Sequence, residues 1–167
     1  MNLTEYLLEQ LESEAAATRR VLQNVPEGCN SWKPHPKSME LGYLAALCAR
    51  MPAWLAAMIK HDQLEFADSS SPYHPMVQNS VGDLVALLDK SIAEAREALR
   101  TTTDDHLMTN WKLLARGAVV AEQPRYVVIR DSLFSHLSHH RGQLTVYLRL
   151  NDAKVPALFG PSADERG

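Results

Sequence analysis

Four stretches of this chain repeat apolar residues at steps of three and four, which is the spacing of one face of an α-helix. These stretches cover roughly residues 3–25, 41–58, 81–99 and 129–148. None of the segments between them shows the apolar–polar alternation that is typical of a half-buried strand. A helix with one apolar face must bury that face against another element. The pattern therefore predicts an all-α fold, a four-helix bundle.

Polar residues and a proline mark where these helices begin and bend. Asn2 and Thr4 are both suitable N-caps for the first helix, and the sequence does not decide between them. Ser38 and Ser80 precede the second and third stretches and are predicted to cap them. Pro52 falls inside the second stretch. It predicts a bend, because proline removes one backbone hydrogen bond from a helix.

The connections between the helices are polar or irregular. Residues 68–79 are rich in serine and proline and are predicted to form a loop. Residues 101–124 are longer than a usual helix connection, and we expect a short extended piece there that packs over one end of the domain. No repeat or linker divides the chain, so residues 1–167 are predicted to form a single domain.

Charge and composition exclude several classes of partner. The chain has 17 basic and 20 acidic residues and a formal net charge of −3, so no nucleic-acid partner is predicted. No run approaches the roughly 20 apolar residues that span a bilayer. Residues 1–10 carry acids and no basic segment, so we expect no secretory signal and a cytoplasmic protein. There the two cysteines, Cys29 and Cys48, would stay reduced.

Three histidines lie close together in the last stretch. His136 and His140 are four residues apart, so they share one helix face, and both fall on its apolar side. They could converge on one metal ion in the bundle core. His139 is rotated by about 100° from His140 and would point towards a neighbouring helix or the rim. The alternative is a pair of core histidines satisfied by hydrogen bonds, and the spacing alone leaves both interpretations open.

The residues around these histidines resemble a known family. The nine residues from His136 to Leu144, His-x-x-His-His-Arg-Gly-Gln-Leu, look like the last-helix motif of DinB/YfiT-like proteins. Further similar segments, which bring the resemblance to essentially the whole chain, are residues 32–38 (Trp-Lys-Pro-His-Pro-Lys-Ser), 41–45 (Leu-Gly-x-Leu-Ala), 146–151, 155–156 and 160–165.

This resemblance implies a DinB-like four-helix bundle that forms a homodimer and holds a divalent metal, zinc or nickel, on three histidines. Two of these match His136 and His140. The third belongs to a Leu-Ala-Ala-His pattern in the second helix, where this chain ends the pattern with Leu47. A leucine cannot bind a metal. The adjacent Cys48 is rotated by about 100°, so its thiolate would not simply replace the missing imidazole.

Two functions of different classes follow from the resemblance. In the first, the chain is a DinB-like protein of unassigned activity whose metal site is partial and degenerate. A small molecule would then bind in a pocket lined by Leu47, Cys48 and His139. In the second, it is a metal-dependent enzyme related to the thiol S-transferases, isomerases or hydrolases of the family. Leu47 counts against the enzyme.

Overall fold

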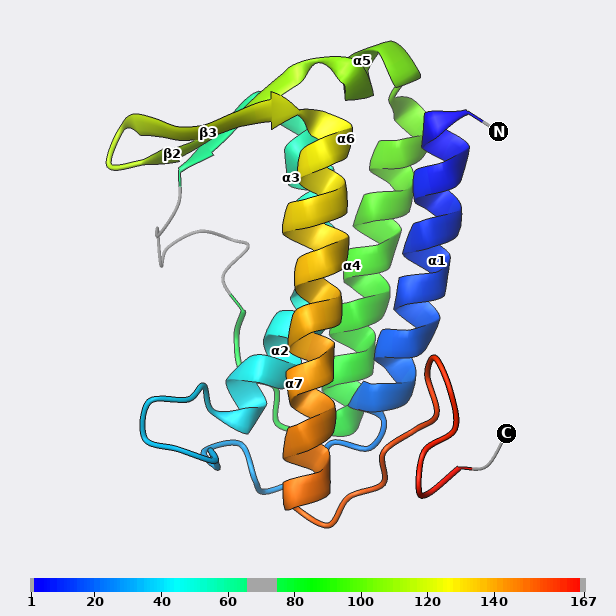
Figure 1. The fold of residues 1–167 in the computed structure, drawn as a ribbon, viewed down its shortest axis with the longest axis vertical. Helices are drawn as coiled ribbons and strands as arrows, with labels where there is room; N and C mark the ends of the chain where they lie inside the picture. Colours follow the sequence, from blue (N-terminus) through cyan, green and yellow to red (C-terminus); the bar gives the residue numbers. More distant parts are fainter. Residues whose placement is uncertain (1, 66–74, 166–167) are drawn as a thin grey trace.

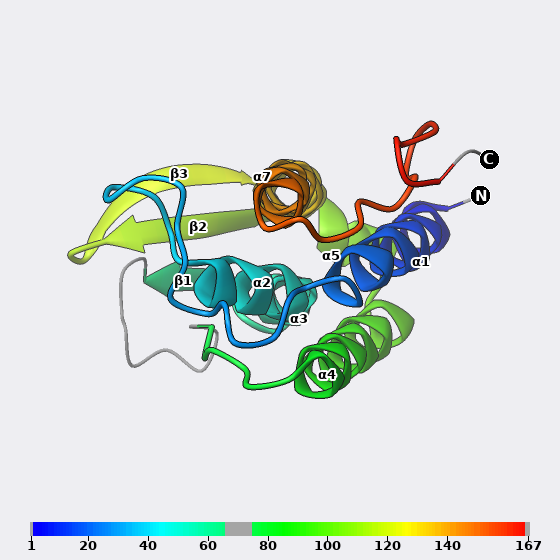
Figure 2. The same ribbon diagram turned by 90° about the horizontal axis from the view of Figure 1, so that it is seen from below.

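Four long helical segments lie side by side in the computed structural model of the protein, which describes residues 2–65 and 75–165 (Figures 1 and 2). In chain order they are α1 (Leu3–Leu22), the pair α2 (Leu41–Arg50) and α3 (Pro52–Lys60), α4 (Val81–Thr101), and the continuous run of α6 (Arg125–Val128), η1 (Ile129–Ser135) and α7 (His136–Leu150). The predicted helices are therefore confirmed. Residues 68–74 of the expected loop lie outside the described residues, and the single domain stays a prediction.

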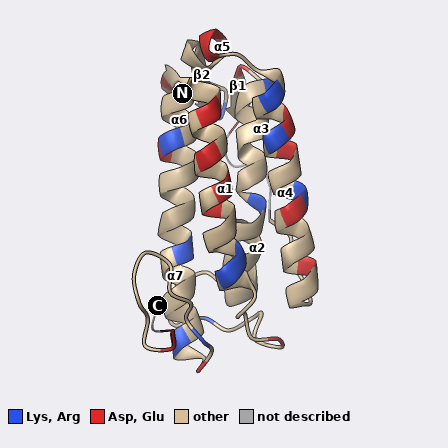
Figure 3. Ribbon diagram, turned by 90° about the vertical axis from the view of Figure 1, so that its right-hand side faces the viewer, with Lys and Arg blue, Asp and Glu red and all other residues tan. Residues whose placement is uncertain are grey.

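Asn2, and not Thr4, caps α1. Its side-chain oxygen accepts the backbone N–H of Glu5 at 2.8 Å, and the Glu5 carboxylate accepts the backbone N–H of Asn2 in return. Ser80 caps α4 as predicted, because its hydroxyl accepts the backbone N–H of Asp83 at 3.1 Å. Figure 3 shows that acidic residues occupy the first half of α1 and basic residues its end. This order stabilises the helix, because the helix dipole is positive at the N-terminus and negative at the C-terminus.

The prediction that Ser38 caps the second helix was wrong, because α2 begins only at Leu41. Backbone carbonyls replace the side-chain cap. The N–H of Leu41 donates to the carbonyl of Trp32 at 2.8 Å, and that of Gly42 donates to Asn30 at 3.0 Å. A Cβ at Gly42 would lie 2.7 Å from Oδ1 of Asn30, so this close approach requires glycine.

Pro52 divides the second stretch into α2 and α3, as predicted. It occupies the first turn of α3, where its missing N–H costs no helical hydrogen bond. The two helices meet at 47°. Within the described residues, no single helix is long and apolar enough to cross a membrane. By length and composition, α2 and α3 would reach that threshold only if they were counted together as one bent pair.

The expectation of an all-α chain was wrong for the connection before the last helix. Residues there form β2 (Asn110–Ala115) and β3 (Ala118–Pro124), an antiparallel hairpin, and β1 (Gln63–Glu65) pairs parallel to β2. The hairpin projects to one side of the helices (Figure 1). Residues 118–123 are exposed on both faces of the strand, so no burial pattern imposes an alternating sequence.

A buried arginine joins this sheet to the helices. Arg125 is 1% exposed and begins the run that carries the three histidines. Its Nε donates to the carbonyl of Met58 at 3.1 Å, and its terminal nitrogens donate to Thr109 and Asp62. One side chain thus connects the end of α3, the start of the hairpin and the start of the last helical run.

A short helix, α5 (Asp104–Met108), packs over the end of the bundle at which α1 begins (Figure 1), as expected for this connection. The Asp104 carboxylate accepts the backbone N–H of Leu3 at 2.8 Å and of Thr4 at 3.0 Å. These hydrogen bonds satisfy two of the N–H groups that the first turn of α1 leaves without a helical partner.

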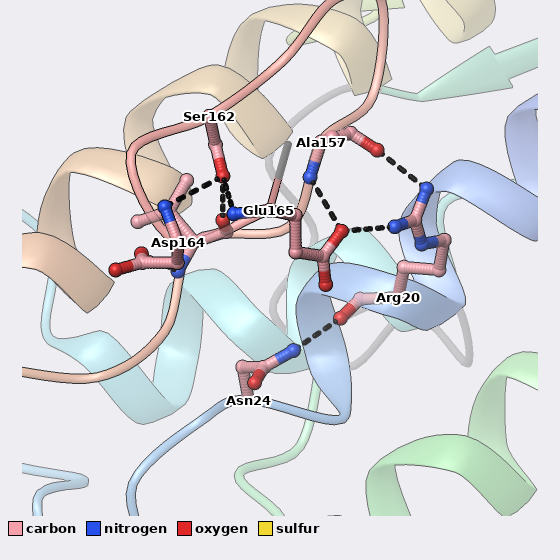
Figure 4. A network of polar contacts seen from close by, with 7 residues as sticks. Arg20, Asn24, Ala157, Ser162, Asp164 and Glu165 are labelled. Atoms are coloured by element: carbon pink, nitrogen blue, oxygen red, sulfur yellow. Dashed lines mark hydrogen bonds and ion pairs between the residues drawn. The ribbon is translucent and has the colours of Figure 1, made fainter. Parts of the chain in front are cut away.

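The irregular C-terminal segment follows α7 and folds back beside α1 (Figure 1). Figure 4 shows how its acidic end closes the loop. The Glu165 carboxylate accepts the backbone N–H of Ala157 at 2.9 Å and pairs with Arg20 of α1. The hydroxyl of Ser162 accepts the backbone N–H groups of Asp164 and Glu165. Part of the family-like motif at residues 160–165 thus has a structural role.

Candidate functional site

His136 and His140 face each other on α7, as their spacing predicts. Their Nε2 atoms lie 2.8 Å apart and the ring centroids 4.5 Å apart. One imidazole therefore donates a hydrogen bond to the other, which is how the core-histidine interpretation would satisfy them. That the pair binds a metal stays a prediction.

One further nitrogen of the pair has a partner in the structure. Nδ1 of His140 lies 2.8 Å from Oε1 of Gln143, one turn further along α7. Gln143 thus holds Nδ1 of His140, and the two Nε2 atoms face each other.

A neutral pair carries the protons that both contacts need. The contact between the two rings and the contact at Gln143 each require one N–H. Two neutral imidazoles have two N–H groups. His140 then donates from Nδ1 to Gln143, and His136 donates from Nε2 to Nε2 of His140.

Burial favours this neutral form. His140 is 7% exposed and His136 is half-buried. Burial lowers the pKa of both rings, and for His136 the adjacent His140 lowers it further. The pair is therefore mostly neutral at pH 7.

Two other rings border the pair. Trp54, on α3, has its centroid 5.9 Å from that of His136. The ring of His139 lies 5.1 Å from that of His140, and its side chain is exposed. His139 thus occupies the rim, one of the two positions that its rotation on the helix predicts.

Leu47 and Cys48 do not supply a third ligand. Leu47 is 6% exposed and Cys48 is fully buried. Burial raises the pKa of the Cys48 thiol to about 12, and the charge of Arg141 offsets this only in part. A thiol with such a pKa stays protonated, whereas a zinc ligand must be a thiolate.

The residues present do not fit a three-ligand metal site. Among residues 2–65 and 75–165, no group of three His, Cys, Asp or Glu side chains could hold a metal ion. His136 and His140 remain a pair of donors without a third, so no chemical step through a metal follows from this geometry.

Sequence reasoning missed two features that position the pair. Gln143 belongs to the quoted motif, and its place three residues after His140 is a signal that could have identified it. The other is η1, a π-helical segment that ends directly before His136. Such segments often occur at functional sites, but no residue pattern in 129–135 distinguishes one from an α-helix.

A curated protein similar to this chain has no assigned activity in its name. No family model matches the chain. The uncharacterized protein YrdA of Bacillus subtilis (strain 168) is 24% identical over 162 residues, which are 96% of this chain and 90% of that protein.

Two solved structures are similar over nearly their whole length. A DinB-like protein from Bacillus cereus ATCC 10987 has a TM-score of 0.71 at 23% identity and covers 93% of this chain and 97% of its own. The DinB-like protein YjoA from Bacillus subtilis has a TM-score of 0.68 at 18% identity and covers 97% and 99%. The chain therefore has the fold of the DinB-like proteins, as the resemblance of its last helix predicted.

Proposed function

We propose that this chain is a DinB-like protein with a divalent-metal site reduced to two histidines, and that it binds a small molecule at this site without a resident zinc or nickel ion. One observation carries the proposal. The Nε2 atoms of His136 and His140, which would face a metal, instead lie within hydrogen-bonding distance of each other.

The side chains around the pair favour a binding site. Leu47 is buried and stands where the family pattern has its third histidine, so it would contribute apolar surface to this site. Trp54 adds an aromatic ring beside His136. An apolar wall with a few oriented polar groups is the usual composition of a small-molecule site. The two imidazoles would supply one donor and one acceptor to the ligand.

The second candidate is a metal-dependent enzyme related to the thiol S-transferases, isomerases or hydrolases of the family. The hydrogen bond between His140 and Gln143 favours it. Metal-binding histidines commonly donate their second N–H to such an acceptor, which directs the other nitrogen at the ion. A metal enzyme would need a third protein ligand, and neither Leu47 nor Cys48 provides one.

Restoring the missing ligand tests the proposal. Zinc and nickel affinities are measured by competition with a chromogenic chelator for the wild type, Leu47→His and Leu47→His/His140→Ala. We expect weak binding by the wild type. Leu47→His should raise the zinc affinity by more than about tenfold, because each added ligand contributes several kcal/mol.

The double variant Leu47→His/His140→Ala is the matched control and should lose the increase in zinc affinity that Leu47→His provides. Stoichiometric, chelator-resistant zinc in the wild type would overturn the proposal and support the enzyme. An unchanged affinity in Leu47→His, with an unchanged melting temperature, would show that residue 47 does not face the pair.

The resemblance also implies that the protein forms a homodimer. We propose that this dimer acts in the cytoplasm and has no nucleic-acid partner. Light scattering after size-exclusion chromatography measures the mass directly. A mass near twice that of the 18.7 kDa chain is expected. A monomer at micromolar concentration would contradict this part of the proposal.

A further inference from the structure

A cavity lies in the groove between α1 and the run α6–η1–α7, and the histidine pair does not line it. Figure 3 faces the side on which these helices are neighbours. The groove has a volume of about 700 Å³, which is within the range of small-molecule sites. Its apolar walls include Leu7 on one side and Phe134 on the other. Neither His136 nor His140 lines it.

One end of the groove is closed by a buried and neutral polar cluster. Glu14 is 7% exposed and pairs with Arg141, which is 1% exposed. Nε2 of Gln10 donates to Oε1 of Glu14 at 2.9 Å, and Arg141 also donates to the hydroxyl of Thr18 at 3.2 Å. The two buried charges compensate each other, so this end offers hydrogen-bonding groups without a net charge.

The mouth of the groove carries a different set of groups. Tyr6 of α1 and Tyr126 and Arg130 of the opposite wall all line it. Arg130 donates its Nε and Nη2 hydrogens to the neighbouring Asp131. Its Nη1 has no hydrogen-bond partner among residues 2–65 and 75–165.

Both phenols line the same groove as this guanidinium. The hydrogen bond with Asp131 raises the pKa of Arg130 most, and the Tyr126 and Tyr6 groups raise it further. Guanidinium and phenol hydroxyls are the donors that recognise carboxylates and similar anions. The ion pair between Arg130 and Asp131 does not prevent Arg130 from binding an anion. Both side chains are exposed, and such surface pairs contribute little energy and leave other N–H donors of the arginine available.

We propose that this groove is a binding site for an amphipathic organic anion, whose charged group contacts Arg130 at the mouth and whose apolar body lies against Leu7 and Phe134. Hydroxyl or amide groups on the ligand would reach Gln10 at the closed end. This site is separate from the histidine pair, so its occupancy does not depend on the proposed function.

Fluorescence of 8-anilinonaphthalene-1-sulfonate, an aromatic monoanion, tests the site in the full chain. We expect saturable binding by the wild type. Arg130→Gln should weaken it by about tenfold, since a hydrogen bond to a charged group is lost. Arg96→Gln, which removes another exposed arginine far along α4, is the matched control and should bind as the wild type does.

Two further variants locate the dye. Ser135→Trp places a large ring at the edge of the groove and should abolish binding, whereas His140→Ala should leave it unchanged. Melting temperatures within a few degrees of the wild type would show that the variants are folded. Decanoate should displace the dye, and decanol at the same concentration should not.

If Arg130→Gln binds the dye as tightly as the wild type, or if decanol displaces the dye as well as decanoate does, the ligand need not be an anion and the proposal is overturned. If Ser135→Trp binds the dye unchanged, the dye does not bind in the groove and the proposed location is wrong. Loss of binding in His140→Ala alone would place the dye at the histidine pair, which contradicts this inference and leaves the proposed function intact.

Discussion

Gln143 accepts a hydrogen bond from Nδ1 of His140 at 2.8 Å, and this single contact determines which way the proton of the buried imidazole points. With the proton on Nδ1, the Nε2 lone pair of His140 faces His136. The amide of Gln143 therefore decides whether the pair presents a lone pair or an N–H to a ligand.

The tautomer of His140 should depend on Gln143. In the wild type at pH 7 we expect the Nδ1–H form, read from two-bond proton–nitrogen correlations of the imidazole. Gln143→Leu should shift the population towards Nε2–H, because the acceptor at Nδ1 is gone. Gln123→Leu, on exposed β3, is the control and should leave the ring unchanged. An Nε2–H majority in the wild type would contradict the assignment.

Replacing Glu14 should destabilise the fold strongly. Glu14→Ala leaves the buried Arg141 without its counter-charge, and breaking such a pair costs about 3–5 kcal/mol. The matched control is Glu12→Ala, two residues away on α1, which removes the exposed pair with Arg96. It should cost at most about 1 kcal/mol. Urea unfolding measures both, and equal losses would argue against the buried pair.

Asp104 should make the protein less stable in acid. Hydrogen bonds from the backbone of Leu3 and Thr4 hold the pKa of its carboxyl below the ordinary value. A carboxyl with a lowered folded-state pKa stabilises the fold above its unfolded pKa, and this is lost as the pH falls through the folded pKa.

Asp104→Asn should therefore lower the free energy of unfolding at pH 7 and flatten its decline below about pH 4. Melting curves from pH 7 to pH 2.5 measure the effect. Asp105→Asn, at the next position, serves as control, because within the described residues the hydrogen bonds from α1 go to the Asp104 carboxylate. A decline as steep in Asp104→Asn as in the wild type would contradict the expectation.

The two cysteines should differ sharply in reactivity. Cys48 is fully buried with a thiol pKa of about 12, whereas Cys29 is half-buried. With a thiol-specific disulfide reagent at pH 8, only Cys29 should react while the protein is folded. Cys29→Ser should then show no reaction until denaturant is added. Rapid labelling of Cys48 in that variant would show that the α2 core opens readily.

The long helices were predictable because each buries one continuous face, and burial leaves a period in the sequence. Leu84, Leu88 and Ile92 follow that period along α4 and are all buried. The β2–β3 hairpin leaves no comparable record, because Val119 and Val120 point to opposite sides and are both more than half exposed. A strand with no buried face does not need apolar and polar residues at alternating positions.

The site was predictable to the same extent. Helical spacing alone brings His136 and His140 together, and the resemblance marks Leu47 as the departure from the family pattern. The hydrogen bond to Gln143 depends on side-chain rotation, which the residue types do not specify.

The π-helical segment before His136 has a consequence for how chain length can vary. A wider turn takes up an additional residue without lengthening the helix in proportion. Removing one residue from 129–135 is expected to convert the segment to an ordinary α-helix and to leave α7 in place. A chain shortened by one residue at this point would then keep the spacing of His136 and His140 and their orientation towards each other.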